Sequence, residues 1–331
     1  MINVGIIGFG VMGEIRYHEL CKNDNINVKM IYDPQKPEKI NNIEMVTSYS
    51  DILNNNDINA VFICTPIYLN AKITCESLLA NKHVFCEKPP TLTSQEMIDI
   101  IDIEKKSNTK LMYGFNHRHH GSIKKIKEIV QSNVFGKILW MRGRYGKSVD
   151  SNFFKNWRSD KKQSGKGILF DQGIHMLDIF LYLANDFDLA KSFVTNSYWN
   201  LDIEDNAFVI LKNTKNKITA SLHSTMTQWR HLFSLEVFFE KGSMILNGLK
   251  TTSDSYGDEI LAISKNRSIT PKAEWIEEEK IIYKKIDFWQ SEIKYFCKCI
   301  LEDKKISNGN SEDALKIMKL LEKIYEDSKN E

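Results

Sequence analysis

The first 115 residues alternate between short apolar runs and stretches whose apolar positions recur at helical spacing. This alternation predicts a parallel sheet whose strands are joined by crossover helices. The expected strands are Asn3–Ile7, Val28–Tyr32, Ala60–Cys64, His83–Cys86 and Leu111–Tyr113, and the expected helices are Val11–Lys22, Asn70–Ala80 and Ser94–Lys106. Because right-handed crossovers keep such strands parallel, their carboxyl ends form one rim, where we expect ligands to bind.

After about residue 116 the pattern changes to a period of two, which predicts an antiparallel sheet with one buried face. The expected strands are Ile138–Arg144, Phe208–Leu211, Ile218–Ser224 and Leu235–Phe239, with helices at Ser122–Gln131, Phe170–Ala184, Asp287–Glu302 and Ser311–Lys329. We therefore expect an α/β protein with a parallel-sheet domain over residues 1–116. A second α/β domain over residues 117–331 carries a large, mainly antiparallel sheet, and its last helices can pack back on the first domain.

The composition is that of an ordinary globular chain, with 45 basic and 43 acidic residues among 331. This near balance gives no large field that would favour nucleic acid or an anionic membrane. The chain enters a strand pattern directly after Met1, and no uninterrupted apolar run approaches membrane-spanning length, so we expect a cytoplasmic protein. Its six cysteines form no C-x-x-C pair and no metal-ligand spacing, which indicates free thiols and no metal.

A glycine motif follows the first predicted strand and opens the first predicted helix: Gly8-Phe9-Gly10-Val11-Met12-Gly13. In this context G-x-G-x-x-G predicts a Rossmann dinucleotide site, in which the helix N-terminus binds the pyrophosphate. Asp33 ends the second predicted strand 20 residues after Gly13, where a carboxylate accepts hydrogen bonds from the adenosine ribose. That carboxylate repels a 2′-phosphate, so we predict NAD, with NADP left open because Lys36 is close in sequence.

Further polar residues follow the remaining strands of the first domain: Thr65-Pro66, Glu87-Lys88-Pro89 and Asn116. A separate D-x-G-x-H segment runs from Asp171 to His175 at a predicted helix start. In this combination and order, the chain resembles the Gfo/Idh/MocA oxidoreductases, named for glucose–fructose oxidoreductase and inositol dehydrogenase. The resemblance implies a Rossmann domain, a second domain whose sheet often makes subunit contacts in dimers or tetramers, and reacting roles for Lys88, Asp171 and His175.

Elementary chemistry agrees with those roles. Residues four apart share one face of a helix, so Asp171 and His175 can address the same substrate carbon. A histidine with a pKa near 6.5 can accept the hydroxyl proton of an alcohol, which makes His175 the expected general base. Lys88 is expected to stabilise the reacting oxygen, and Glu87 to hold Lys88 against the nicotinamide ribose.

Other site residues follow from the same resemblance, with several departures. Asn70 stands where the family usually has histidine, and we expect it, with Thr65, Pro66 and Asn116, to contact the cofactor. The expected substrate-binding residues are Arg118, Trp157, Arg158 and Lys166, of which Lys166 replaces a glycine of the usual G-G-G. For His117, His119 and His120 we favour exposed or ribose-contacting positions over a metal site.

The sequence thus predicts an NAD(P)-dependent oxidoreductase that transfers hydride at a ring carbon of a sugar, nucleotide sugar or cyclitol. The cluster of Arg118, Arg158 and Lys166 leaves room for an anionic substrate. Two other functions stay open: a glycosidase or lyase that uses transient oxidation by bound NAD, and a dinucleotide-binding sensor without catalysis. We expect a homodimer or homotetramer.

Overall fold

The structure is a computed structural model that describes residues 1–35, 40, 43–155, 157–265 and 278–329. Lys36, which left NADP open as a cofactor, lies outside these residues. The chain divides into two compact units, the first formed by residues 1–116 and 288–319 and the second by residues 117–287 and 320–331. Each unit is described separately below.

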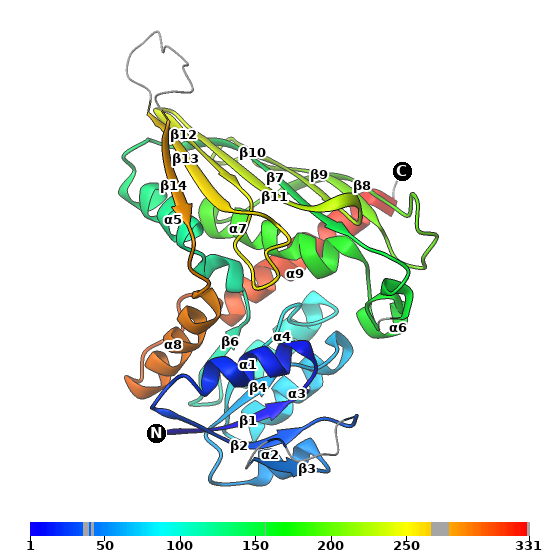
Figure 1. The fold of residues 1–331 in the computed structure, drawn as a ribbon, viewed down its shortest axis with the longest axis vertical. Coiled ribbons are helices and arrows are strands. Elements are labelled where there is room, and N and C mark those ends of the chain that lie inside the picture. Colours follow the sequence, from blue (N-terminus) through cyan, green and yellow to red (C-terminus); the bar gives the residue numbers. More distant parts are fainter. Residues whose placement is uncertain (36–39, 41–42, 156, 266–277, 330–331) are drawn as a thin grey trace. The chain divides into compact units, whose positions relative to one another are not determined.

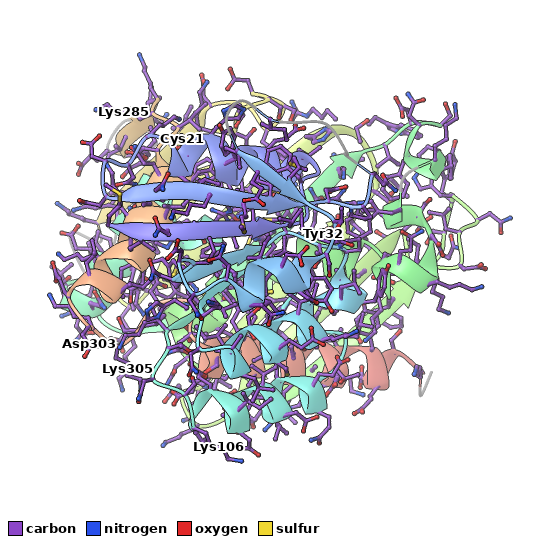
Figure 2. The ribbon with its side chains drawn as sticks, turned by 90° about the horizontal axis from the view of Figure 1, so that it is seen from below. Cys21, Tyr32, Lys106, Lys285, Asp303 and Lys305 are labelled. Atoms are coloured by element: carbon purple, nitrogen blue, oxygen red, sulfur yellow. The ribbon has the colours of Figure 1, made fainter. Side chains whose placement is uncertain are left out.

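The first unit contains a six-stranded sheet of order β3-β2-β1-β4-β5-β6, in which every neighbouring pair is parallel. Its strands are β1 (Ile2–Ile7), β2 (Ile26–Tyr32), β3 (Glu44–Val46), β4 (Ala60–Ile63), β5 (His83–Cys86) and β6 (Leu111–Tyr113). The helices between them are α1 (Val11–Leu20), α2 (Tyr49–Asn54), α3 (Ile67–Leu79) and α4 (Ser94–Glu104). Figure 2 shows Tyr32 at the carboxyl end of β2 and Cys21, which follows α1, toward the opposite end of the strands. The predicted parallel sheet is confirmed, with β3 and α2 as additions.

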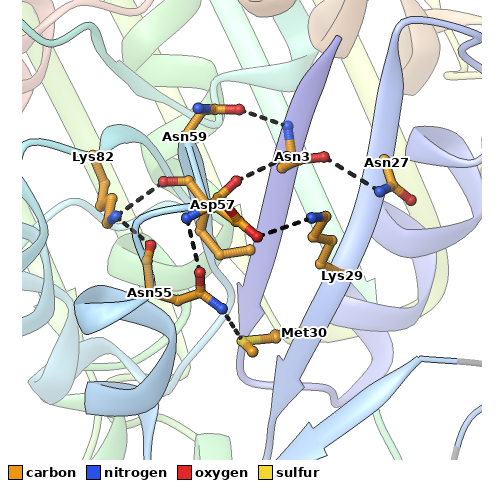
Figure 3. Close-up of polar contacts among 9 residues, drawn as sticks. Asn3, Asn27, Lys29, Met30, Asn55, Asp57, Asn59 and Lys82 are labelled. Carbon is orange, nitrogen blue, oxygen red and sulfur yellow. Dashed lines mark hydrogen bonds and ion pairs between the residues drawn. The ribbon is translucent and has the colours of Figure 1, made fainter.

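Amide side chains fix the register at the amino end of this sheet (Figure 3). The Asn3 backbone N–H donates to Asn59 Oδ1 over 2.9 Å, and its side-chain amide donates to the Asp57 carbonyl over 2.8 Å. Asn27 Nδ2 in turn donates to Asn3 Oδ1 over 3.2 Å. One asparagine of β1 therefore links β2 on one side to the turn before β4 on the other.

A helix from near the chain end, α8 (Phe288–Leu301), completes the core of the first unit. Phe296 of α8 makes edge contacts with Phe62 of β4 and Phe85 of β5, each with ring centroids 5.7 Å apart. The predicted second domain ran through residue 331, with its last helices able to pack back on the first domain, and Phe288–Lys319 groups with the first unit. The physical reason is this aromatic packing, which buries the apolar side of α8 against the parallel sheet.

A buried arginine in α1 joins the same region. The Arg16 guanidinium is fully buried and pairs with Glu87 over 2.6 Å and with Glu292 of α8 over 2.7 Å. It also lies over the ring of Phe85 at 4.4 Å. Burial alone would lower the pKa of Arg16, but the charges of Glu292 and Glu87 raise it above its usual value, so the side chain stays cationic.

The second unit contains an eight-stranded sheet of order β14-β13-β12-β11-β7-β10-β9-β8. The strands are β7 (Ile138–Ser148), β8 (Leu189–Thr195), β9 (Asn206–Asn213), β10 (Ile218–Thr225), β11 (Thr227–Phe239), β12 (Gly242–Asn247), β13 (Glu259–Lys265) and β14 (Glu279–Tyr283). All neighbours are antiparallel except β7 and β10, which run parallel in the middle of the sheet. The predicted mainly antiparallel sheet is confirmed, with β8, β12, β13 and β14 as additions.

Helices cover one face of this sheet: α5 (Gly121–Ser132), α7 (Ile174–Ala184) and the later part of α9 (Ser311–Lys329) (Figure 1). A short α6 (Lys161–Ser164) precedes α7. The stretch Lys161–Ala184 is long and apolar enough by composition to span a membrane, but 83% of its apolar window is buried inside the fold, as in a core helix. In the described residues the other face of the sheet carries no helix.

The ion pairs of Arg16 generate a stability prediction. Glu292→Gln removes one of two carboxylates from a fully buried cation and is expected to lower the free energy of unfolding by about 3 kcal/mol, as for other broken buried pairs. Chemical denaturation of the variant and the parent chain measures the difference. The matched control is Asp102→Asn, which breaks the exposed pair with Lys105 and should change nothing measurable. Equal losses in both variants would contradict the role given to the Arg16 cluster.

Candidate functional site

The glycine motif forms the turn between β1 and α1, and each glycine has a different steric reason. Gly8 has a φ of +91°, and a Cβ built on it would lie 2.7 Å from the Cys64 carbonyl oxygen. A Cβ on Gly13 would collide with the Gly8 carbonyl oxygen. A Cβ on Gly10 would meet no heavy atom within 4 Å. Two glycines are therefore required by the fold itself, whereas the fold leaves open space beside Gly10, as expected where a pyrophosphate approaches the backbone.

Asp33 lies over this turn. Its Oδ2 accepts a hydrogen bond from the Phe9 backbone N–H over 2.6 Å, and its Oδ1 accepts one from Gln35 N–H over 2.8 Å. The carboxylate directly follows the carboxyl end of β2, where the ribose of a dinucleotide is expected. Val11, 72% exposed, and the half-buried Met12 open α1 at the same place.

Lys88 lies in the turn that follows β5, between Glu87 and a cis peptide bond to Pro89. The side-chain amide of Asn70, on α3, donates to the carbonyl oxygens of Glu87 and Pro89 over 3.2 and 2.9 Å. Its Oδ1 accepts from the Thr65 hydroxyl over 2.9 Å. Asn70 is only 1% exposed, and its amide contacts the Lys88 turn. The predicted contact between Asn70 and a cofactor stays a prediction. Pro66 precedes α3 as its N-cap residue.

The Glu87 carboxylate has a partner inside the first unit. The sequence predicted that Glu87 holds Lys88 against the nicotinamide ribose; in the structure its Oε1 accepts from Arg16 Nε over 2.7 Å and the residue is 5% exposed. A carboxylate engaged by a buried cation is held inside the first unit, so we assign Glu87 to the support of the turn. Asn116 begins the 3₁₀ turn Asn116–His119 and is buried at the end of the first unit's initial segment.

In the second unit the D-x-G-x-H segment does not start as a plain α-helix. Residues Leu169–Gly173 form a π-helical turn that passes into α7 at Ile174. Such turns are rare and occur frequently at functional sites. Asp171 faces Arg158, with Arg158 Nε 3.6 Å from Asp171 Oδ2, and the Arg158 guanidinium lies 4.5 Å from the ring centre of Trp157. The structure thus brings together three of the predicted site residues.

His175 is buried and stacks on a second imidazole. The ring centroids of His175 and His117 are 4.0 Å apart with planes inclined by 21°. His117 Nε2 lies 3.1 Å from the Tyr145 hydroxyl, and Gln172 Nε2 donates to the Tyr256 hydroxyl over 2.7 Å. Burial raises the pKa of Tyr256 to about 12 and holds that of Tyr145 well above its usual value, so both phenols stay protonated.

The three neighbouring histidines were expected to be exposed or to contact ribose. The prediction that they are exposed is wrong. His117, His119 and His120 are 5%, 4% and 3% exposed. His120 Nδ1 lies 2.7 Å from the buried Glu259 carboxylate. No group of three or more His, Cys, Asp or Glu side chains that could hold a metal ion occurs among the described residues.

Two predicted substrate-binding cations have interior partners instead. Arg118 is 3% exposed and donates to both oxygens of Asp178 over 2.8 and 2.6 Å, while lying over the ring of Tyr182. The Lys166 ammonium lies 3.9 Å from the ring centre of Tyr325. Burial lowers the pKa of Lys166 against the opposing charge of Glu204. The two hydrogen bonds to Asp178 therefore hold Arg118 within the second unit, and the cation–π contact with Tyr325 holds Lys166 there.

Sequence reasoning missed Glu204, which supports the π-helical turn. Its carboxylate accepts from the backbone N–H groups of Gly167 and Leu169 over 2.7 and 3.2 Å, and from the Tyr325 hydroxyl over 2.6 Å. Burial raises the pKa of Glu204, opposed by these hydrogen bonds. The partners of Glu204 lie 37 and 121 positions away from it in the sequence, so no local motif predicts these contacts. Tyr145 and Tyr256 were missed for the same reason, because His117 and Gln172, which they contact, are also distant in sequence.

Two family models match the chain. One, described as the oxidoreductase family with an NAD-binding Rossmann fold, matches residues 2–115, and the other, the GFO/IDH/MocA C-terminal domain, matches residues 123–245. An uncharacterized oxidoreductase, YrbE of Bacillus subtilis, is 27% identical over 263 residues, which are 76% of this chain and 75% of the relative.

Myo-inositol 2-dehydrogenase of Thermotoga maritima is 25% identical over 273 residues, covering 78% of this chain and 79% of that protein. The solved structure of levoglucosan dehydrogenase in complex with NADH and levoglucosan superposes with a TM-score of 0.85 at 21% identity, over 99% of this chain and 97% of that one. That level of identity supports the fold alone. With both of its units matched by the corresponding models, the chain belongs to the GFO/IDH/MocA family of oxidoreductases.

Proposed function

We propose that this protein catalyses NAD-linked oxidation or reduction at a ring carbon of a sugar, nucleotide sugar or cyclitol. The observation that carries the proposal is the fit of the β1–α1 turn to a dinucleotide, since open space lies beside Gly10 and Asp33 lies over the same turn. The family assignment favours an enzyme over the sensor that the sequence left open.

The first unit holds the cofactor in this proposal. Backbone N–H groups at the start of α1 bind the pyrophosphate, and Asp33 accepts hydrogen bonds from the adenosine ribose. A 2′-phosphate would bring a second negative charge to that carboxylate, so NAD is preferred over NADP. When bound, the dinucleotide supplies the two-electron hydride acceptor for oxidation or the donor for reduction.

The side chains of the chain handle the proton. During oxidation, the substrate carbon loses its hydrogen with both bonding electrons, and the hydroxyl loses its proton, leaving a ketone. His175 accepts that hydroxyl proton, and Lys88 donates a hydrogen bond to the same oxygen as negative charge develops on it. Asp171, facing Arg158, binds neighbouring hydroxyl groups and sets which ring carbon reacts. In reduction the proton returns from His175 to the carbonyl oxygen.

The cations that suggested an anionic substrate all have partners of opposite charge or aromatic character within the second unit. Arg118 binds Asp178, Arg158 faces Asp171, and Lys166 lies over Tyr325 near Glu204. Arginine and lysine side chains that recognise a phosphate or carboxylate of a substrate form charge-assisted hydrogen bonds with it, and here these three side chains already have other partners. We therefore propose a neutral polyhydroxyl substrate, such as a free sugar, a glycoside or a cyclitol.

We also propose that the helix-free face of the eight-stranded sheet contacts a second copy of the chain. Phe193 and Phe208 are 61% and 51% exposed and pair across β8 and β9, and Phe208 stacks on His223 of β10 at 3.9 Å. Ile210 lies on β9, like Phe208, and is 56% exposed. A contiguous row of apolar side chains on an uncovered sheet face is typical of a protein–protein contact.

The glycine turn gives a binding prediction. Gly10→Ala places a methyl group in the open space without touching the protein, so the thermal midpoint of the free protein should change little, while the Kd for NADH rises at least about tenfold, or about 1.4 kcal/mol. NADH fluorescence and circular dichroism measure the two quantities. Gly13→Ala is the contrasting control, because its Cβ meets the Gly8 carbonyl oxygen and should lower the midpoint itself. Unchanged NADH affinity in Gly10→Ala would exclude this turn as the pyrophosphate site.

Catalysis gives a second prediction. With NAD and a panel of sugars and cyclitols, NADH formation at 340 nm should appear for the parent chain, with a lower rate on NADP. His175→Ala and Lys88→Ala should each reduce kcat roughly 10²–10⁴-fold. His18→Ala, an exposed histidine of α1, is the control and should retain full activity.

Other outcomes of this assay separate the alternatives. Product formation without net NADH would support transient oxidation, the glycosidase or lyase mechanism. Full activity of both variants would contradict the roles given to His175 and Lys88. Cofactor binding without turnover on any substrate of the panel would overturn the proposal of a sugar or cyclitol oxidoreductase.

The assembly gives a third prediction. Phe208→Glu puts a charge in the middle of the exposed aromatic row and should shift the mass measured by light scattering after gel filtration from that of an oligomer toward 38.4 kDa. Leu79→Glu, at a 69% exposed apolar residue of α3, is the matched control and should leave the mass unchanged. A parent chain that already elutes as a monomer would contradict the assembly proposal.

A further inference from the structure

We propose that Asn70 is a positioning residue for Lys88: its side-chain amide fixes the turn on which the reacting amine stands. The inference rests on the proposed function, because it matters for catalysis only if Lys88 takes part in the reaction. It differs from the role expected for Asn70 at the sequence level, which was direct contact with the cofactor.

The amide bridges the carbonyl groups of the two residues that flank Lys88. Asn70 Nδ2 donates to the carbonyl oxygen of Glu87 over 3.2 Å and to that of Pro89 over 2.9 Å. Both carbonyls can only accept hydrogen bonds, so they fix which end of the amide faces the turn. The Thr65 hydroxyl donates to Asn70 Oδ1 over 2.9 Å from the other side.

This arrangement uses the hydrogen-bonding capacity of Asn70 almost completely. An asparagine amide offers two donors and one acceptor oxygen, and here both donors and the oxygen have partners inside the first unit. The residue is 1% exposed. Asn70 Nδ2 cannot also donate to a cofactor hydroxyl without breaking a buried hydrogen bond, and we infer that its effect on the reaction passes through the turn.

The turn is held from its other side by ionic contacts. The Glu87 carboxylate binds Arg16, whose guanidinium is itself fixed by Glu292 and by the ring of Phe85. The Glu87 backbone N–H donates to the Ile63 carbonyl over 2.9 Å, which ties the turn to β4. Glu87, before Lys88, is therefore held at its backbone N–H, its carbonyl and its side chain. Pro89, after Lys88, is held at its carbonyl.

Such anchoring matters because a lysine side chain has four rotatable bonds and needs a fixed base to place its amine. A displacement of about 1 Å in a reacting group can reduce the rate 10²-fold. Within the described residues, the amide of Asn70 is the contact that reaches both peptide carbonyls around Lys88. We infer that it contributes to kcat without contributing to cofactor affinity.

The test is a double-mutant cycle on the full-length protein. Asn70→Ala and the isosteric Asn70→Asp should each lower kcat roughly 10²-fold, with the Kd for NADH unchanged. In the Lys88→Ala background, adding Asn70→Ala should cause no further loss, because a positioning residue has nothing left to position. Ser77→Ala is the matched control: it also removes a buried polar group of α3, whose hydroxyl donates to the Ile73 carbonyl within the same helix, and should leave kcat unchanged.

Asn70→Asp keeps the inference testable if the alanine variant does not fold. Its ionised carboxylate faces two carbonyl oxygens and repels them, whereas its protonated form can donate one hydrogen bond. The kcat of Asn70→Asp should therefore decline toward high pH where that of the parent chain does not.

Several results would overturn the inference. A raised Kd for NADH at unchanged kcat would restore the cofactor-contact role of Asn70, and additive losses in the cycle would show that Asn70 acts independently of Lys88. Full activity of Asn70 variants beside an inactive Lys88→Ala would remove the inference and leave the proposed function intact. Full activity of Lys88→Ala would instead contradict the proposed function.

Discussion

The first unit depends on the neutralisation of one buried cation. Arg16 has no contact with solvent, so its charge is stable only because Glu87 and Glu292 supply carboxylates at hydrogen-bonding distance. These three residues come from the helix that follows the glycine turn, from the turn that carries Lys88 and from a helix near the chain end. A single ionic cluster thereby fixes the geometry of the dinucleotide turn and of the lysine turn together.

The second unit uses buried acids in a comparable way, although with different partners. Glu204 accepts backbone N–H groups at the start of the π-helical turn, Glu259 pairs with His120, and Asp178 binds Arg118 through two hydrogen bonds. Each acid is satisfied by donors from elements distant in sequence. The imidazole stack of His117 and His175 lies among these fixed groups, so its orientation is set by polar contacts as well as by apolar packing.

Local patterns were sufficient to predict the parallel sheet, the glycine turn and most helices, because strand period, capping and turn chemistry are encoded within a few residues. The helix predicted over Ser94–Lys106 begins at Ser94, after a capping box formed by Thr93 and Glu96. Strands β12, β13 and β14 were missed because their identity depends on pairing with β11 and with one another. In the candidate site, the motif residues Lys88, Asp171 and His175 were visible in sequence. The partners of Asn70, Glu87, Arg118 and Lys166 depend on the folded chain, so no local motif could predict them.

The division of the chain between the two units determines which fragments of the protein contain a complete core. The polypeptide passes from one unit to the other three times, after Asn116, after Asp287 and after Lys319. A fragment that stops at residue 116 would contain the whole parallel sheet, yet it would lack Phe296 from the aromatic core and one of the two carboxylates beside Arg16. The nucleotide-binding half is therefore completed only after the intervening residues 117–287 of the second unit have been synthesised, so it should reach its final form after most of the second unit has left the ribosome.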